Sequence, residues 1–115
     1  MKKKTPKKNI YTADQVFAIA KLLEQVYHLY PATTPEQKSL RSIAFELEET
    51  FSAKRKKLIK SNDLFEQDKT HSIKLKYHEE WALQTIIADL LSTVTDIKAQ
   101  NDLRIVSDYL HQKNC

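Results

Sequence analysis

The sequence contains no glycine, only three prolines and a single cysteine. Glycine is the residue that most readily adopts positive φ angles, so its absence disfavours the tight primed turns of β-hairpins. It also excludes a Walker A phosphate loop, a dinucleotide-binding GxGxxG loop and the nucleophile elbow of hydrolases. The composition therefore argues against a β-rich fold and removes several classes of enzyme.

Long hydrophobic segments are missing as well. The longest apolar runs hold only four or five residues, as in VFAIA from Val16 to Ala20, whereas a membrane-spanning helix needs about 20. We expect no membrane span, and no secretory signal, because polar and charged residues interrupt the sequence that follows the basic start. The lone Cys115 provides no internal disulfide framework. These features are typical of a cytoplasmic protein.

What remains is typical of one globular domain: 115 residues, 41% of them hydrophobic and 30% charged. The net charge of +4 is unevenly distributed, because five of the nineteen basic residues fall within the first eight positions. The other fourteen nearly balance the fifteen acidic residues. We predict a flexible basic arm over residues 1–9 and a single helical domain over residues 10–115. The basic residues of the arm are Lys2, Lys3, Lys4, Lys7 and Lys8.

Two segments carry the start signal of a helix. In YTADQ, Thr12 can cap a helix and Gln15 can complete a capping box. In TTPEQ, Thr34 and Gln37 repeat the pattern around a proline at the first helical position. The first helix is expected to end before Pro31, because the residue before a proline disfavours helical angles.

The stretch SIKLKYH, residues 72–78, alternates as a strand does. The sequence offers no second strand to pair with it, and an isolated strand is not stable. We therefore predict a third helix from about Ile73 and a fourth that ends near Leu110, either separate or joined as one bent helix. Together the helices predict an all-α, antiparallel bundle of about four helices. In the first helix the apolar positions are Val16, Ile19 or Ala20, Leu23, Val26 or Tyr27, and Tyr30. In the later helices they are Leu40, Ile43 or Ala44, Leu47, Phe51, Leu58, Leu83, Ile86, Ile87, Leu90, Leu91, Val94, Ala99, Leu103, Val106 and Leu110.

A basic segment, FSAKRKKLIK, ends the second predicted helix. Cations near the C-terminus of a helix interact favourably with its dipole, which favours a solvated helix end. The alternative is a contact with an acidic partner, together with the arm. The candidate contact residues are Lys54, Arg55, Lys56, Lys57 and Lys60.

The only tryptophan, Trp81, follows two glutamates in YHEEW. Neighbouring Glu79 and Glu80 point about 100° apart on a helix, so they do not converge as a catalytic pair. Trp81 is expected at the edge of the apolar face. If partly exposed, it is a candidate binding anchor.

Arg104 and His111 are seven residues apart in RIVSDYLH, which loosely resembles the Arg–His pattern of HEPN-type ribonucleases. The resemblance would imply action on RNA at a dimer seam. It covers these two positions alone, and Ile105 stands where the family has a polar residue. None of the four histidines has the spacing of a metal site. We predict no catalytic residue, no metal and no cofactor.

The sequence thus predicts a small non-enzymatic helical module that acts through a macromolecular partner. A protein partner is favoured. The alternatives are a nucleic-acid-associated factor, using the arm and residues 54–60, and a bacteriocin-immunity-like protein. The last is an analogy of size and helical class with small proteins that protect bacteria from their own bacteriocins. The sequence does not determine the oligomeric state.

Overall fold

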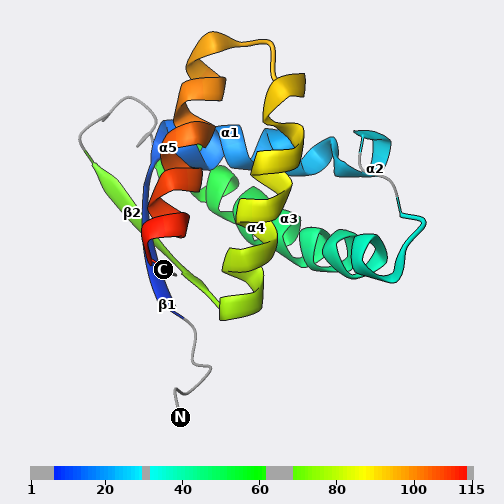
Figure 1. Ribbon diagram of the computed structural model, residues 1–115. Helices are drawn as coiled ribbons and strands as arrows, with labels where there is room; N and C mark the ends of the chain where they lie inside the picture. The colour runs from blue at the N-terminus through cyan, green and yellow to red at the C-terminus, as the bar shows by residue number, and fades with distance from the viewer. Residues whose placement is uncertain (1–6, 30–31, 62–68, 114–115) are drawn as a thin grey trace.

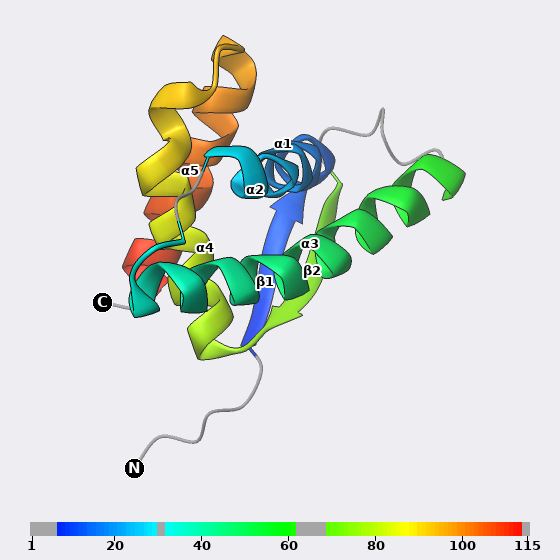
Figure 2. The ribbon, with the colours of Figure 1, turned by 90° about the vertical axis from the view of Figure 1, so that its right-hand side faces the viewer.

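The computed structural model describes residues 7–29, 32–61 and 69–113. Most of these residues are helical, which confirms the predicted helical character. α4 and α5 lie side by side and run in opposite directions, whereas α1 and α3 run across them (Figures 1 and 2). The elements in chain order are β1 (Lys7–Thr12), α1 (Ala13–Glu24), α2 (Val26–Leu29), α3 (Pro35–Ser61), β2 (Thr70–Leu75), α4 (Tyr77–Leu90), the 3-10 turn η2 (Leu91–Thr93) and α5 (Ile97–Lys113).

Both predicted helix starts are confirmed. The Thr12 hydroxyl accepts a hydrogen bond from the Gln15 amide at 3.2 Å, and the Gln15 side chain accepts one from the Thr12 amide at 2.9 Å. Thr34 and Gln37 make the same reciprocal pair, both bonds at 3.1 Å. The first helix is shorter than predicted, because it is interrupted at Gln25, between α1 and α2.

A two-stranded antiparallel sheet is the feature that the sequence analysis missed. The prediction of a helix from about Ile73 is wrong, because residues 70–75 form β2 and α4 begins at Tyr77. The partner strand is β1, in which Asn9 pairs with Ile73 and Tyr11 pairs with His71. Residues 7–9 of the predicted arm therefore belong to the sheet, and residues 1–6 lie outside the described residues. Helices α1 to α3 separate the two strands in the sequence, so no hairpin-turn motif predicts their pairing.

One hydrophobic core joins the helices and the inner face of the sheet. η2 and the following turn separate α4 from α5, so they are two helices. Four of the predicted core positions, Ile43, Leu91, Val94 and Ala99, are only partly buried and pack against this core. The predicted position Tyr30 lies outside the described residues, as does the side chain of Tyr27. The other predicted positions are buried: Val16, Ile19, Ala20, Leu23, Val26, Leu40, Ala44, Leu47, Phe51, Leu58, Leu83, Ile86, Ile87, Leu90, Leu103, Val106 and Leu110.

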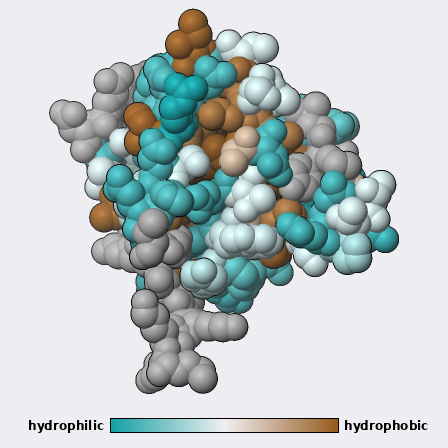
Figure 3. Space-filling model, viewed as in Figure 1, coloured by the Kyte–Doolittle hydropathy of each residue, from teal (hydrophilic) through white to brown (hydrophobic). Residues whose placement is uncertain are grey.

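The surface view shows hydrophobic residues gathered between α4 and α5 (Figure 3). Large exposed hydrophobic side chains also occur singly on several elements, which is normal for a folded domain. Within the described ranges, no helix is both long and apolar enough to cross a membrane. The exposed large hydrophobic residues are Ile10, Phe45, Ile59, Tyr77, Trp81, Ile97 and Ile105.

Candidate functional site

The predicted basic residues near the end of α3 form what we call the α3 basic cluster: Lys54, Arg55, Lys56, Lys57 and Lys60. Lys56, Lys57 and Lys60 are exposed and Lys54 is half-buried. Leu58, between them, is buried with 2% of its surface exposed, so packing continues on one face of the helix beyond the point where the sequence suggested that it fades. The cations thus occupy the solvent side of a helix that is still packed.

Arg55 differs from its neighbours because it is held in place. Its guanidinium donates to the Glu24 carboxylate of α1 at 2.8 Å. Lys60 lies in the last turn of α3, where a cation near the negative end of the helix dipole is stabilised by about 0.3–1 kcal/mol. The exposed lysines of the cluster are accessible to an acidic partner.

Trp81 lies near the start of α4 with 40% of its surface exposed, and Tyr77 lies one turn earlier with 50% exposed. Side chains four residues apart on a helix are neighbours, so the two rings share one face. The backbone carbonyl of Trp81 accepts a hydrogen bond from the Thr85 hydroxyl at 2.9 Å. The sequence analysis singled out Trp81 and missed Tyr77, because it placed this segment inside a helix that began earlier.

Two exposed lysines precede this aromatic pair in the sequence: Lys74 of β2 and Lys76 before α4. The Lys76 amide donates to the Glu79 side chain at 2.8 Å, which caps the helix. We call Lys74, Lys76, Tyr77 and Trp81 the α4 corner.

The basic arm joins the fold at the α4 corner. β1 begins at Lys7, which pairs with Leu75 two residues before α4. The other end of the sheet, where Thr12 pairs with Thr70, lies about 17–20 Å away along the strand. The last turn of α3 projects to the right in Figure 2, away from the start of β1 at the bottom. The structure therefore does not bring the attachment point of the arm together with the α3 basic cluster.

A buried ionic cluster, Asn9–Glu80–Lys113, lies behind the corner. Glu80 and Asn9 are fully buried. One Glu80 carboxylate oxygen accepts from the Asn9 amide group at 2.9 Å and from the Lys113 ammonium at 3.1 Å. Lys113 also donates to the Asn9 side-chain carbonyl at 3.1 Å, so each member contacts the other two. The cluster ties β1 to the start of α4 and to the end of α5.

Tyr11 lies next to this cluster on the inner face of β1. Its ring packs edge-to-face with Phe51 at 5.7 Å and with Tyr109 at 6.3 Å between ring centroids. Its hydroxyl and the second Glu80 carboxylate oxygen have no hydrogen-bond partner among the described residues. Burial raises the pKa of Tyr11 well above its ordinary value, and the nearby Tyr109 and Glu80 raise it further. The phenol is therefore held neutral.

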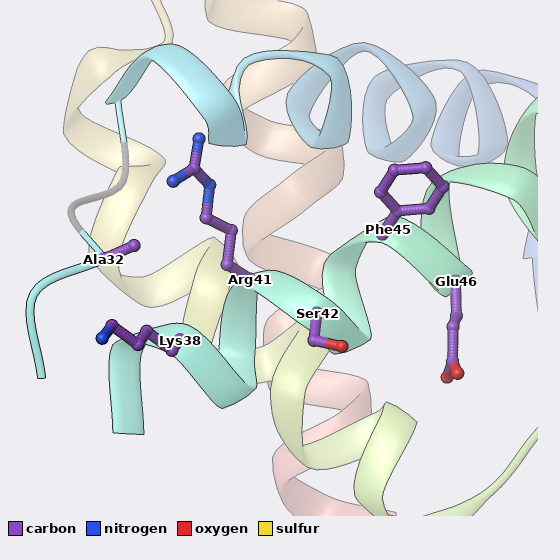
Figure 4. A pocket seen from close by; sticks show the side chains of 6 residues that line it. All are labelled: Ala32, Lys38, Arg41, Ser42, Phe45 and Glu46. Atoms are coloured by element: carbon purple, nitrogen blue, oxygen red, sulfur yellow. The ribbon is translucent and has the colours of Figure 1, made fainter. Parts of the chain in front are cut away.

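One hollow lies beside α3, near its first turns, and has a volume of about 590 Å³ (Figure 4). Its side chains do not converge, since Arg41 points toward α2 and Glu46 points away from it. An arrangement of this kind does not hold a small ligand at one point. The residues lining it are Ala32, Lys38, Arg41, Ser42, Phe45 and Glu46.

A second hollow, of about 200 Å³, lies between α1 and the turn that precedes α5. A third hollow adjoins it and is lined by charged residues that form ion pairs with one another. The Lys98 ammonium lies 3.1 Å from the Asp14 carboxylate and 3.5 Å from that of Asp102. The hydrogen bond to Asp14, more than any other contact, raises the pKa of Lys98.

Arg104 and His111 are both exposed on α5. His111 Nδ1 lies 3.2 Å from the Gln84 side-chain nitrogen of α4. Among the described residues, no group of three or more His, Cys, Asp or Glu is arranged to hold a metal ion.

Comparisons with protein-family models, with curated proteins and with solved structures find no match to this chain.

Proposed function

We propose that this chain is a small non-enzymatic binding module that acts through a macromolecular partner at the α4 corner. The observation that carries the proposal is the exposure of Tyr77 and Trp81 one turn apart on α4. Aromatic side chains supply much of the binding energy of macromolecular interfaces, because they bury a large area and lose little conformational freedom. The partner is a protein or, as the alternative, a nucleic acid.

Rigid support behind the aromatic pair favours this proposal. Ile87 and Leu83 bury the opposite face of α4 in the core. Glu80, one residue before Trp81, is fixed by Asn9 and Lys113. A contact surface held in place before binding loses less entropy when the partner arrives.

Photo-crosslinking tests the proposal. A benzoylphenylalanine in place of Tyr77 is irradiated in a lysate of the native host, with and without nuclease. We expect one discrete crosslinked species that excess unlabelled protein competes away and that excess Trp81→Ala protein does not. The control carries the same group at Ile97, which is 75% exposed on α5. Equal crosslinking from both positions would count against the corner as the contact surface.

A second candidate function is nucleic-acid association through the α3 basic cluster, supported by the exposure of Lys56, Lys57 and Lys60. Such contacts would reach phosphates and not bases, so binding is expected to be steep in salt and weak in sequence preference. Its test is duplex DNA binding at about 50 mM salt, where phosphate contacts are strong. The test compares the protein with a variant in which the cluster lysines are changed to glutamine. Equal binding by both proteins argues against this candidate.

A further inference from the structure

We infer that the second hollow, between α1 and the turn that precedes α5, binds a free α-amino acid with an aliphatic side chain. The Lys21 ammonium receives the carboxylate of the ligand, and the Asp96 carboxylate receives its ammonium. The aliphatic side chain enters the hollow. This inference goes beyond the proposed function, because the hollow lies between other elements than the α4 corner and its ligand is a small molecule.

The hollow has the size and the lining that one aliphatic side chain requires. Its volume is about 200 Å³, whereas an apolar cavity of about 150 Å³ already holds a benzene molecule. Ala18 of α1 and Ala99 of α5 both line it, and an alanine side chain takes up little of the space between two helices. Apolar residues from α1, from the turn and from α5 thus surround the space: Ala18, Leu22, Val94, Ala99 and Leu103.

Most of the charged residues that line this hollow and the adjoining one already form ion pairs. Among the residues that the structure describes, the exceptions are Lys21 and Asp96, and each of them lines both hollows. One cation and one carboxylate without ionic partners match the two opposite charges of an α-amino acid. A ligand with a single charge would satisfy only one of them. The existing ion pairs are those of Arg55 with Glu24 and of Lys98 with Asp14 and Asp102.

The Asp96 side chain is oriented and still has acceptor capacity. Its Oδ2 atom accepts a hydrogen bond from the Ala99 amide at 3.4 Å, which holds the carboxylate at the start of α5. A carboxylate can accept about four hydrogen bonds. The remaining positions are therefore open to an ammonium group of the ligand.

The turn between α4 and α5, which forms one wall of the hollow, is held in place by hydrogen bonds. The Gln100 side chain donates to the carbonyl of Leu91 at 3.4 Å and to that of Val94 at 3.3 Å. The Thr93 hydroxyl donates to the Leu90 carbonyl at 2.6 Å. The hollow is thus largely formed before a ligand arrives, which lowers the entropy that binding costs.

The test is a titration of the intact, isotope-labelled protein with L-leucine, followed by amide chemical shifts in NMR spectra. A dissociation constant of about 1 mM is a modest affinity for so small a ligand, so the titration extends to about 10 mM. We expect saturable shifts at the amides that line the hollow, among them those of Leu22, Val94 and Ala99. The amides of Tyr77 and Trp81 at the α4 corner should stay unchanged.

Two analogues of leucine separate its charges. Isocaproate has the carboxylate without the ammonium, and isoamylamine has the ammonium without the carboxylate. Each should bind about 2- to 5-fold more weakly than L-leucine, as expected for the loss of one solvent-exposed ion pair.

Variants assign each charge to its residue. Lys21→Met should bind isoamylamine as tightly as L-leucine, and Asp96→Asn should bind isocaproate as tightly as L-leucine. Asparagine retains the capping bond at the start of α5, because its side-chain oxygen also accepts. Ala99→Leu fills the hollow and should abolish the shifts. The matched control Asp108→Asn, at an exposed position of α5 that does not line the hollow, should leave the affinity unchanged.

Other outcomes would overturn the inference. Equal affinity for L-leucine and both analogues would exclude recognition of a zwitterion. Shifts that are absent, or that lie outside the hollow, would exclude the site, as would unchanged binding by a folded Ala99→Leu protein. If circular dichroism shows that Ala99→Leu does not fold, the two charge variants decide. The crosslink at position 77 tests the proposed function separately, so the two can fail independently.

Discussion

The α3 basic cluster and the α4 corner both present lysines to solvent, but they differ in what surrounds the charge. In the cluster, Arg55 pairs with Glu24, and Lys60 lies in the last turn of α3, where the helix dipole favours a cation. At the corner, two exposed aromatic rings follow Lys74 and Lys76 in the sequence, and the neighbouring Glu80 is buried against Lys113. The sequence places more lysines on α3, whereas the two exposed aromatic rings are the reason that we propose α4 as the contact surface.

The strongest test removes one lysine from the buried ionic cluster, which fixes Glu80 of α4, and one from the α3 basic cluster. Lys113→Met leaves the buried Glu80 without its cation, and breaking a buried ion pair in this way costs about 3–5 kcal/mol. The Lys113 side chain is 20% exposed, which places the expected loss near the lower end. The matched change Lys57→Met should stay within about 0.5 kcal/mol, as is typical of surface sites. Urea unfolding followed by circular dichroism measures both.

A double variant separates the ion pair from simple packing. Glu80→Met combined with Lys113→Met removes both charges, and such replacements are often neutral or stabilising. We expect it to recover most of the loss caused by Lys113→Met. The single variant Glu80→Met completes the comparison. If the loss of unfolding free energy in the double variant equals the sum of the losses in Glu80→Met and Lys113→Met, the two residues are not coupled and the buried ionic cluster has no special role.

The next largest effect is a difference in unfolding free energy between variants on the buried face and on the exposed face of α4. Ile87 and Leu90 are buried in the core, so changing either to alanine should cost about 2–5 kcal/mol in the free energy of unfolding. Tyr77→Ala on the exposed face should cost far less, within about 0.5 kcal/mol. A loss within that same small range for Ile87→Ala would show that the supposed core face is open to solvent.

Tyr11 makes the corner sensitive to alkaline pH in a way that the α3 cluster is not. Since burial raises the pKa of Tyr11 in the folded protein, the unfolded chain releases this proton first as the pH rises. Its contribution to stability is fully present below about pH 10, the ordinary pKa of tyrosine, and is lost progressively above it. Unfolding of the native protein and of Tyr11→Phe at pH 9 and pH 11 isolates the effect. The same decline in both proteins would assign it to other groups.

The smallest effect is expected in the α3 basic cluster itself. Changing Lys54, Lys56, Lys57 and Lys60 to glutamine should alter the unfolding free energy by about 0.5 kcal/mol or less. Arg55→Gln removes a partly exposed ion pair and should cost at most about 1 kcal/mol. Unfolding of the glutamine variant under native conditions would show that the cluster is a packed element of the fold.

The helices could be predicted from the sequence because their signals are local. Thr12 with Gln15, and Thr34 with Gln37, satisfy each other within one turn. The strand pattern from Ser72 onward was visible too, but its partner was not. In β1, the inner positions hold Asn9 and Tyr11 and the outer ones include Ile10, so hydrophobic alternation does not mark the strand. Its pairing depends on contacts with residues 58 to 68 positions away.

The α4 corner was only half visible in the sequence. Trp81 could be singled out as the only tryptophan. Tyr77 and the lysines could be grouped with it only after the structure showed that α4 begins at Tyr77. Glu80 gave no sign of burial, because a glutamate beside another glutamate near a helix start is typical of solvent-exposed positions. Its burial follows from Asn9 and Lys113, which only the folded chain brings to it.

The Asn9–Glu80–Lys113 contact also determines when this protein can finish folding during synthesis. Asn9 and Lys113 are 104 positions apart, so the first strand leaves the ribosome long before its last partner exists. At about 5–20 residues per second, β1 waits roughly 5–20 seconds for α5 to be completed. During that interval its inner face, with Tyr11 and Asn9, is open to whatever the nascent chain encounters. A ribosome stalled before codon 113 should therefore display an N-terminal segment that proteases can cut, and release of the finished chain should protect it.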